Sequence, residues 1–182
     1  MEMTDHVELV VELPWKWNPP EVGWFKINVD GAIFSKQKCV GIGVLIRDEL
    51  VRVEAALSKK VDAPLGAMEV EAKVLEAGLL FARDVGLQDV VLEGDLVNLI
   101  NALCGTSSPP AAVEPTIMDV LDLCRQFRNL AFSHVHRKGN VPAHLLAKHV
   151  SNIADFISWI EENSYCIEQA LIQDVLSFFR FQ

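Results

Sequence analysis

Apolar and polar residues alternate with a period of two along residues 24–34. The apolar positions are Phe25, Ile27, Val29 and Ile33, and the polar positions between them are Lys26, Asn28 and Asp30. A period of two places successive side chains on opposite faces of a pleated sheet, so the pattern predicts a β-strand. Asp30 is a carboxylate within a run of strand formers, and Gly31 after it leaves room for a ligand near the backbone.

Two further apolar runs follow, over residues 39–47 and 50–57, and the short polar turn Arg47-Asp48-Glu49 joins them. Connections this tight allow hairpins and not crossovers, so the first three strands are predicted to form an antiparallel meander. The polar stretch at 58–66 ends the meander.

The clearest helical pattern comes next, with apolar residues at steps of three and four ending before Gly86. Its apolar positions are Met68, Ala72, Leu75, Leu79 and Ala82. Strands are then predicted at 89–92 and 130–136, and helices at 96–104, 117–124, 143–150, 153–163 and 166–179. A meander followed by alternating helices and strands predicts an α/β fold, with a mixed five-stranded sheet of three antiparallel and then two parallel strands flanked by helices.

The chain divides by pattern into three parts: a lead-in segment at 1–20, the α/β domain at 21–150, and a helical extension at 151–182. The lead-in contains Trp15-Lys16-Trp17-Asn18-Pro19-Pro20, which is too rich in proline for a helix or a central strand. We interpret the two tryptophans as caps of a core edge, with base stacking as the alternative. The apolar faces of the extension either pack on the domain or form a homodimer interface.

Composition narrows the class of protein. The 182 residues are 51% hydrophobic, yet no apolar run approaches the length of a membrane helix and no signal peptide opens the chain, so we expect a soluble intracellular protein, nuclear or cytoplasmic. The four cysteines are scattered, which favours reduced thiols over disulfides or a zinc site. A net charge of -9 argues against a broadly basic nucleic-acid-coating protein, but not against an enzyme whose acids hold cations.

Three carboxylates are expected at one end of the sheet. Asp95 ends a strand predicted to run parallel to the first, so it occupies the same kind of place as Asp30, and Glu69 lies in the first turn of the long helix. Such carboxylates repel unless they accept hydrogen bonds or hold cations, which is the physics of a two-metal phosphodiester site. The alternatives are ordinary: Asp30 bonds its own turn, Asp95 caps a helix, and Glu69 pairs with Lys73.

The segment from Gly23 to Ala32, GWFKINVDGA, resembles the start of plant ribonuclease H-like domains, the type 1 fold of reverse-transcriptase-like proteins. Four further segments are similar to motifs of that family, in the family's order: GIGVLIRD at 41–48, EVEA at 69–72, LEGD at 92–95 and HVHRKGNVPA at 134–143. The resemblance covers about residues 17–150. Together the motifs are specific, although each one alone is weak.

The resemblance implies a metal-dependent endoribonuclease that cleaves RNA–DNA hybrids, with an Asp, Glu, Asp, Asp site for two Mg²⁺ or Mn²⁺ ions. Asp30, Glu69 and Asp95 match the first three ligands, with Glu71 as the alternative glutamate. His144 stands where the fourth aspartate is expected, and imidazole adds no negative charge for a hard cation. The other reading is therefore a catalytically degenerate module that binds nucleic acid or protein.

Several other side chains are candidates for contact with the hybrid. Those expected at phosphates are Lys36, Lys38, Arg137 and Lys138, with solvated turns as the alternative. Asn28 is a candidate for recognising the hybrid or orienting Asp30, and His136, on one strand face with His134, for the loop histidine that assists product release in this family. A nucleotide-binding α/β domain is disfavoured, because no GxGxxG or Walker loop follows a strand.

Overall fold

The computed structural model describes residues 7–10, backbone only, and residues 16–179. Seven strands form one sheet in the order β1-β6-β5-β2-β3-β4-β7. The strands are β1 (Val7–Val10), β2 (Phe25–Phe34), β3 (Cys39–Arg47), β4 (Val53–Val61), β5 (Asp89–Gly94), β6 (Asn129–His134) and β7 (Phe156–Ile160). β2, β3 and β4 pair antiparallel, and β5 and β6 run parallel to β2. The five strands expected from the sequence are therefore confirmed, and β1 and β7 extend the sheet at its two edges.

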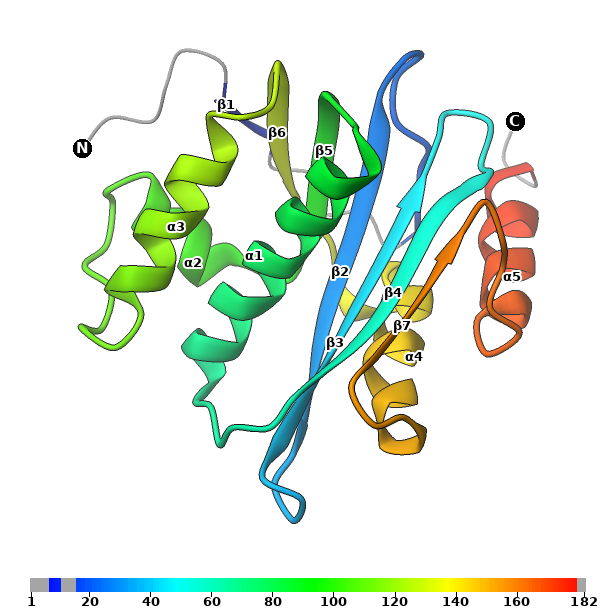
Figure 1. Cartoon of the computed structure of the whole chain (residues 1–182). Helices are drawn as coiled ribbons and strands as arrows, with labels where there is room; N and C mark the ends of the chain where they lie inside the picture. The colour runs from blue at the N-terminus through cyan, green and yellow to red at the C-terminus, as the bar shows by residue number, and fades with distance from the viewer. Residues whose placement is uncertain (1–6, 11–15, 180–182) are drawn as a thin grey trace.

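Helices cover both faces of the sheet (Figure 1). They are α1 (Ala67–Val85), α2 (Val97–Leu103), α3 (Glu114–Cys124), α4 (Val141–His149) and α5 (Glu168–Phe179), with short 3-10 turns η1 (Arg137–Gly139) and η2 (Val150–Asn152). α1, α2 and α3 lie on one face, where most of the hydrophobic core is buried. α4 and α5 lie on the other face, over a smaller cluster that includes Leu45, Leu146 and Leu171.

The long helix α1 follows the predicted apolar spacing and ends where the sequence indicated. Gly86 takes a left-handed conformation, with φ of 90°, and its backbone N–H donates to the carbonyl oxygens of Ala82 and Arg83. A side chain at that φ would be strained, which is why glycine ends the helix here.

The predicted helix at 153–163 is wrong. Residues Phe156–Ile160 form β7, which pairs antiparallel with β4 at the edge of the sheet. Phe156, Ile157 and Ile160 fit a helical stripe, but the run FISWI is also rich in the β-branched and aromatic residues that favour strands. The open edge of β4 then decides between the two conformations, because pairing satisfies its backbone hydrogen bonds. The predicted helix at 166–179 is confirmed as α5.

The helix α5 packs on the domain. Its Asp174 accepts a hydrogen bond at 2.8 Å from Nη1 of Arg47, a residue of β3 that is fully buried. The lead-in also joins the fold: Trp17 is 1% exposed, so its predicted position at a core edge is confirmed, and Trp15 lies outside the described residues. β1, Trp17, β7 and α5 thus all contact the segment assigned to the α/β domain.

The helix α4 lies against β3 because two glycines leave space for its backbone. A Cβ atom on Gly43 would lie 2.0 Å from the carbonyl oxygen of Ala143, and one on Gly41 would lie 1.9 Å from that of Ala147. Contacts this short do not occur, so only glycine at both positions lets α4 approach so closely. The first of these positions matters for the site, because Gly43 is the β3 partner of Asp30.

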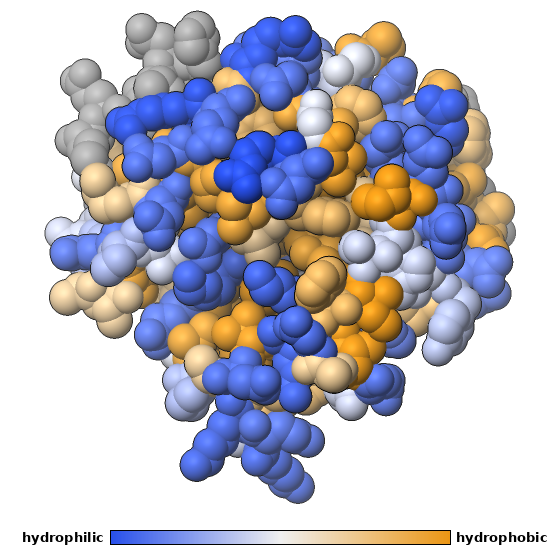
Figure 2. Space-filling view, in the orientation of Figure 1, coloured by the Kyte–Doolittle hydropathy of each residue, from blue (hydrophilic) through white to orange (hydrophobic). Residues whose placement is uncertain are grey.

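The turn between β2 and β3 projects from the body of the molecule. In the space-filling view the projection is almost wholly hydrophilic, at the position that this turn has in Figure 1 (Figure 2). Among the described residues, no helix is long and apolar enough to cross a membrane.

Candidate active site

The strand register places Asp30 and Asp95 at equivalent positions. β2 and β5 pair in parallel from Phe25↔Val90 to Asn28↔Glu93, and beyond that pair no further partners join the two strands. Asp30 and Asp95 each follow two residues after this last pair. Both carboxylates therefore stand where the two central strands separate, which is where open α/β sheets bind ligands.

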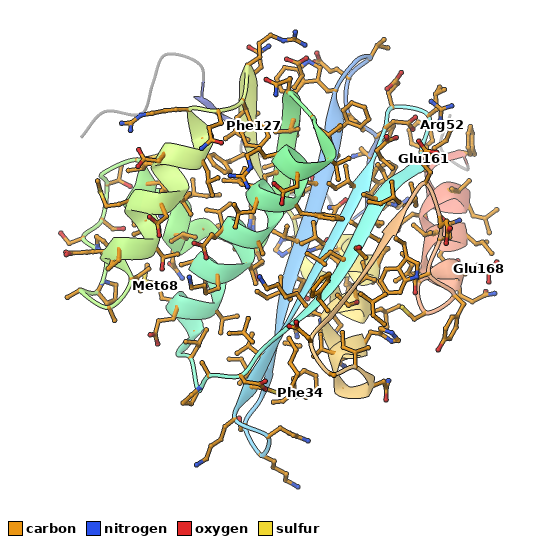
Figure 3. All side chains as sticks on the ribbon, in the orientation of Figure 1. Phe34, Arg52, Met68, Phe127, Glu161 and Glu168 are labelled. Carbon is orange, nitrogen blue, oxygen red and sulfur yellow. The ribbon has the colours of Figure 1, made fainter. Side chains whose placement is uncertain are left out.

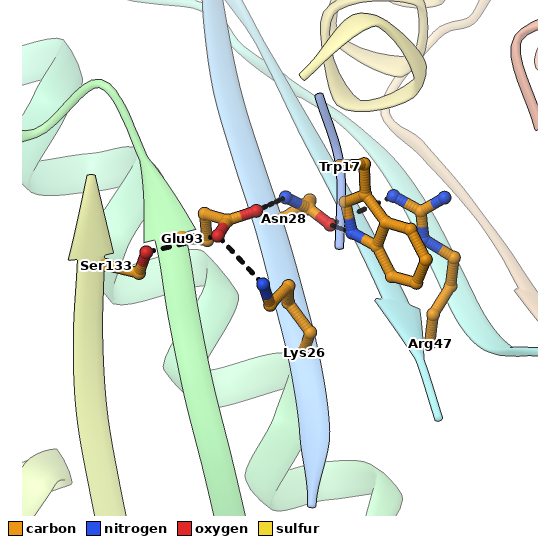
Figure 4. Close-up of polar contacts among 6 residues, drawn as sticks. All are labelled: Trp17, Lys26, Asn28, Arg47, Glu93 and Ser133. Atoms are coloured by element: carbon orange, nitrogen blue, oxygen red, sulfur yellow. Dashed lines mark hydrogen bonds and ion pairs between the residues drawn. The ribbon is translucent and has the colours of Figure 1, made fainter. Parts of the chain in front are cut away.

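A buried polar network ties the two strands together just before they separate (Figure 4). Glu93, which is fully buried, accepts hydrogen bonds from Nδ2 of Asn28 at 2.9 Å, Nζ of Lys26 at 3.0 Å and Oγ of Ser133 at 3.1 Å. A buried carboxylate with three donors has its hydrogen-bonding capacity largely satisfied. The network thus fixes β2, β5 and β6 side by side at the base of the candidate site.

The same network continues through Asn28 toward α5. The side-chain oxygen of Asn28 accepts hydrogen bonds from Nε1 of Trp17 at 2.8 Å and Nη2 of Arg47 at 3.1 Å, and the guanidinium of Arg47 lies 3.7 Å from the ring centroid of Trp17. Burial lowers the pKa of Arg47, and the neighbouring charge of Asp174 opposes this shift. Burial likewise raises the pKa of Asp174, and Arg47 opposes that change. Two buried cations, Lys26 and Arg47, are thereby matched by two carboxylates.

Asp30 accepts a hydrogen bond directly from His144. Nδ1 of His144 donates to Oδ2 of Asp30 at 2.6 Å, and the side chains are 19% and 17% exposed, respectively. Asn140, which precedes the first turn of α4, donates from Nδ2 to the carbonyl oxygen of Val29 at 2.8 Å. This hydrogen bond, together with Gly43, fixes the start of α4 beside β2 and so brings His144 to Asp30.

Glu71 and Asp95 form a second pair of site residues. The backbone N–H of Leu99, in the first turn of α2, donates to the carboxylate of Glu71. Burial raises the pKa of Glu71, and the charge of Asp95 raises it further. Oε2 of Glu71 is buried and has no hydrogen-bond partner. Like charges and an unsatisfied buried oxygen together create an electrostatic demand for a cation.

Glu69 has a different environment. Its Oε2 accepts a hydrogen bond at 2.8 Å from the backbone N–H of Gly66, the N-cap of α1, so it closes a capping box. Glu71, the predicted alternative, is thus the glutamate whose pKa the charge of Asp95 raises. The sequence does not distinguish the two residues, because they lie two positions apart near the start of the same helix.

Two further histidines line the end of β6. Nδ1 of His134 is buried, has no hydrogen-bond partner and lies 3.7 Å from Oδ1 of Asp95, while the side chain of Asp95 is 71% exposed. His136 packs edge-on against the ring of His134, with ring centroids 5.6 Å apart. The structure therefore brings His134 to the candidate site directly, and His136 through His134.

The donor set fits a divalent cation in its chemistry: three carboxylates and two imidazoles flank the point where the strands separate, and Oε2 of Glu71 has no other partner. Within residues 7–10 and 16–179, no three His, Cys, Asp or Glu side chains already lie close enough to hold a metal ion. The site consists instead of the two pairs Asp30–His144 and Glu71–Asp95. Holding a cation would require side chains of the two pairs to turn toward one another.

The predicted nucleic-acid contacts fall into two groups. Lys36, Lys38, Arg137 and Lys138 are exposed, the first two in the projecting turn just beyond Phe34, where side chains with nitrogen tips extend outward (Figure 3). Asn28 is fully buried, and its amide is committed to Trp17, Arg47 and Glu93. The suggestion that Asn28 contacts the hybrid is therefore wrong for this structure, because it has no exposed surface; it supports the strand that carries Asp30.

Sequence reasoning assigned no role to Asn140, Glu93, Arg47 or Asp174. Asn140 offered a usable signal, since asparagine just before Val-Pro favours a helix start. The buried charges offered none, because Lys26 and Glu93 are 67 residues apart and Arg47 and Asp174 are 127 apart. Only the folded sheet shows that they are partners.

The sequence model of the family described as reverse transcriptase-like matches residues 28–150 of the chain. Among curated proteins, none matches the chain.

Solved structures with the same fold include ribonucleases H1. RNase H1 of the archaeon Halobacterium salinarum is 22% identical, with a TM-score of 0.66, and the match covers 72% of this chain and all of the archaeal one. The N-terminal RNase H domain of Rv2228c from Mycobacterium tuberculosis is 20% identical, with a TM-score of 0.63, over 71% of this chain and 94% of that one. LC11-RNase H1 from compost, in complex with an RNA/DNA hybrid, is 19% identical, with a TM-score of 0.54, over 69% and 94%. The fold is therefore ribonuclease H-like.

Proposed function

The chain belongs to the reverse transcriptase-like family, and we propose that it is a divalent-cation-dependent endonuclease that hydrolyses the RNA strand of an RNA–DNA hybrid. The observation that carries the proposal is the pairing of β2 with β5, which leaves Asp30 and Asp95 at equivalent positions beyond Asn28↔Glu93. The unsatisfied buried oxygen of Glu71, beside Asp95, supports it further. One of the similar structures, that of LC11-RNase H1, contains an RNA/DNA hybrid.

In this proposal Asp30, Glu71 and Asp95 hold the cation, with His144 replacing a fourth carboxylate. When bound, the cation would lower the pKa of a coordinated water and polarise a phosphoryl oxygen. Asp30 uses only Oδ2 in its bond to His144, so Oδ1 remains available as a ligand. Asn140 and Gly43 act as positioning residues, because they hold the start of α4 against β2 and thereby keep His144 at Asp30.

The exposed basic residues would hold the hybrid backbone. Lys36 and Lys38 project from the β2–β3 turn, and Arg137 and Lys138 follow β6 in η1. Phosphate contacts position a nucleic acid without reading its sequence, which suits a nuclease that recognises a kind of duplex. They also provide local positive charge on a chain whose net charge is -9.

The proposal is tested by cleavage of a hybrid whose RNA strand is end-labelled, in Mg²⁺ or in Mn²⁺ and with EDTA as a blank. We expect RNA cleavage that requires a cation and falls at least about 100-fold in Asp30→Asn, because loss of the carboxylate weakens cation binding. Single-stranded RNA and duplex DNA serve as substrate controls. Wild-type cleavage no faster than that of Asp30→Asn would overturn the proposal.

A second candidate function is a binding module that has lost hydrolysis. The observation that favours it is the 2.6 Å bond between His144 and Asp30, since an imidazole so placed can occupy a carboxylate that a cation would otherwise use. This function predicts hybrid binding that EDTA leaves unchanged, with no cleavage.

We also propose that the exposed apolar side chains of α5, Ile172, Leu176 and Phe179, form a homodimer interface. A single monomeric species in sedimentation would exclude the dimer.

A further inference from the structure

The strand β7 leaves one edge of the sheet open. It is the last strand in the sheet order, and β4 pairs with one of its two sides. The backbone N–H of Lys60 donates to the carbonyl oxygen of Asp155 at 2.7 Å, and that of Glu161 donates to the carbonyl oxygen of Glu54 at 2.8 Å. Residues 155 and 161 therefore point their backbone groups toward β4. The alternation of an antiparallel ladder then turns the backbone groups of the even-numbered residues of β7 outward.

These outward groups have no protein partner within the part of the chain that the structure describes. The side chains of β7 are exposed as well, by 58% for Phe156, 38% for Ile157 and 51% for Ile160. The strand contains no lysine, no proline and no bulge, which are common means of keeping another strand away from an edge. β7 thus presents unpaired backbone groups and apolar side chains together.

An open groove adjoins this edge on the same face of the sheet as α1. It lies between α1 and the strands β4 and β7, and its lining includes Leu57, Leu80, Phe81, Phe156 and Ser158. Figure 2 shows hydrophobic surface over the region where β4 and β7 lie in Figure 1. A strand added beside β7 would extend the floor of this groove, so its side chains on this face would pack against Phe156.

The surroundings of β7 are acidic. Residues 149–179 contain no lysine or arginine. Exposed carboxylates stand at both ends of the strand, Asp155 before it and Glu161 and Glu162 after it. A second copy of β7, paired antiparallel over its full length, would place Asp155 opposite Glu161 twice, and like charges directly opposite each other destabilise strand pairing. The charge pattern therefore favours a basic partner over a second copy of this chain.

We propose that β7 is a docking edge for a protein partner, which adds an extended segment with apolar residues at alternate positions and lysine or arginine at both ends. The segment pairs with the outward backbone groups of Phe156, Ser158 and Ile160, and its basic ends meet Asp155 and Glu161. Main-chain hydrogen bonds give such strand addition its affinity, and side chains at alternate positions give it specificity. The docking edge uses none of the residues of the proposed nuclease and does not depend on that activity.

The test uses the full chain and two capped peptides that differ only in charge. The first is Lys-Val-Thr-Val-Thr-Val-Lys, in which the three valines match the outward residues of β7 and the lysines match the carboxylates at its ends. The second has glutamate in place of both lysines. An NMR titration gives the dissociation constants, and hydrogen exchange measures the protection of single amides. The lysine peptide should protect the amides of Phe156, Ser158 and Ile160, and should bind at least about tenfold more tightly than the glutamate peptide.

Two sets of variants locate the binding. Ser158→Pro removes an N–H that points away from β4, so the pairing with β4 is retained while an added strand is blocked. It should abolish binding of the lysine peptide, whereas the matched control Ser158→Thr keeps the N–H and should bind like the wild type. Asp155→Lys combined with Glu161→Lys changes no backbone group, and it should reverse the preference in favour of the glutamate peptide.

Three results would overturn the inference: no amide protection by the lysine peptide, equal binding of the two peptides by the wild type, or a preference that the double charge reversal leaves unchanged. Sedimentation tests the other occupant of the edge. Self-association that Ser158→Pro abolishes and Ser158→Thr retains would assign the edge to a second copy of the chain, and would also overturn the inference.

Discussion

Replacing Glu93 with glutamine should be among the most destabilising single changes to the polar residues of this protein. The carboxylate is fully buried and accepts from Lys26, Asn28 and Ser133 at 2.9–3.1 Å. Glutamine keeps the shape but offers one accepting oxygen, and its amide group would face a donor. The change also leaves the ammonium of Lys26, whose side chain is 8% exposed, without a counter-charge.

Removing one partner of a buried ion pair costs about 3–5 kcal/mol, because the other charge remains buried and uncompensated. For a chain of this length each kcal/mol corresponds to a change of about 2–4 °C in Tm, so the loss should be roughly 6–20 °C. The matched control is Glu76→Gln, which breaks the partly exposed pair with Lys73 at 2.7 Å within α1. Exposed pairs at this spacing contribute about 0.2–0.5 kcal/mol, so the control should shift Tm by roughly 2 °C at most.

Thermal and urea unfolding followed by circular dichroism would measure both variants. Adding Lys26→Met to Glu93→Gln should restore part of the lost stability, since the double variant has no buried unpaired ammonium. A Glu93→Gln loss no larger than that of Glu76→Gln would refute the reasoning. A double variant whose loss of unfolding free energy exceeds the sum of the losses of the two single variants would refute it as well.

Three further predictions concern packing, thiol chemistry and the hybrid. Gly43→Ala should cost about 1–3 kcal/mol in unfolding free energy, because its Cβ would meet the Ala143 carbonyl at 2.0 Å; a stability equal to that of the wild type in urea would contradict this packing. Burial raises the pKa of Cys124 from 9.0 to about 12, so the thiol should resist Ellman's reagent at pH 8 until the chain unfolds. Because the folded-state pKa is the higher one, stability should fall as the pH rises above about 9, and rapid native labelling of Cys124 would argue against its burial. Changing both Lys36 and Lys38 to alanine should reduce the number of counterions released on hybrid binding by roughly two, as read from the slope of the log binding constant against the log salt concentration. Lys59→Ala, on β4, serves as the control. An unchanged slope would show that the β2–β3 turn does not contact the hybrid.

The parts of the fold that follow from local pattern were predictable, and the parts that depend on distant partners were not. The period of two in β2 and the spacing of α1 are local, and both elements form as expected. The segment at 156–160 has a helical spacing of apolar residues but a composition that favours strands, and the exposed edge of β4 selects a strand. The partners of Lys26 and Arg47 come from residues far along the chain, so no local pattern indicated them.

In the candidate site, too, the features set by local sequence pattern were predictable and those set by distant contacts were not. Asp30 and Asp95 could be placed at strand ends from the sequence, because strand ends are a property of the pattern. The choice between Glu69 and Glu71 could not be made, since it depends on which carboxylate meets the start of α2 and which closes the cap of α1. The bond from His144 to Asp30 depends on the depth at which α4 packs, which two glycines of β3 determine.

The most direct measurement of the central claim is the rate of hybrid cleavage by Glu71→Gln beside that of Glu69→Gln. Both variants carry the same chemical change two residues apart on one helix, and a contaminating nuclease would be indifferent to both. If the carboxylates at the strand ends form the hydrolytic site, Glu71→Gln should lower the rate at least about tenfold. Glu69→Gln should keep nearly the full rate and lose only about 1 kcal/mol or less of stability with its capping bond. Equal rates for the two variants, or a larger loss in Glu69→Gln, would contradict the account.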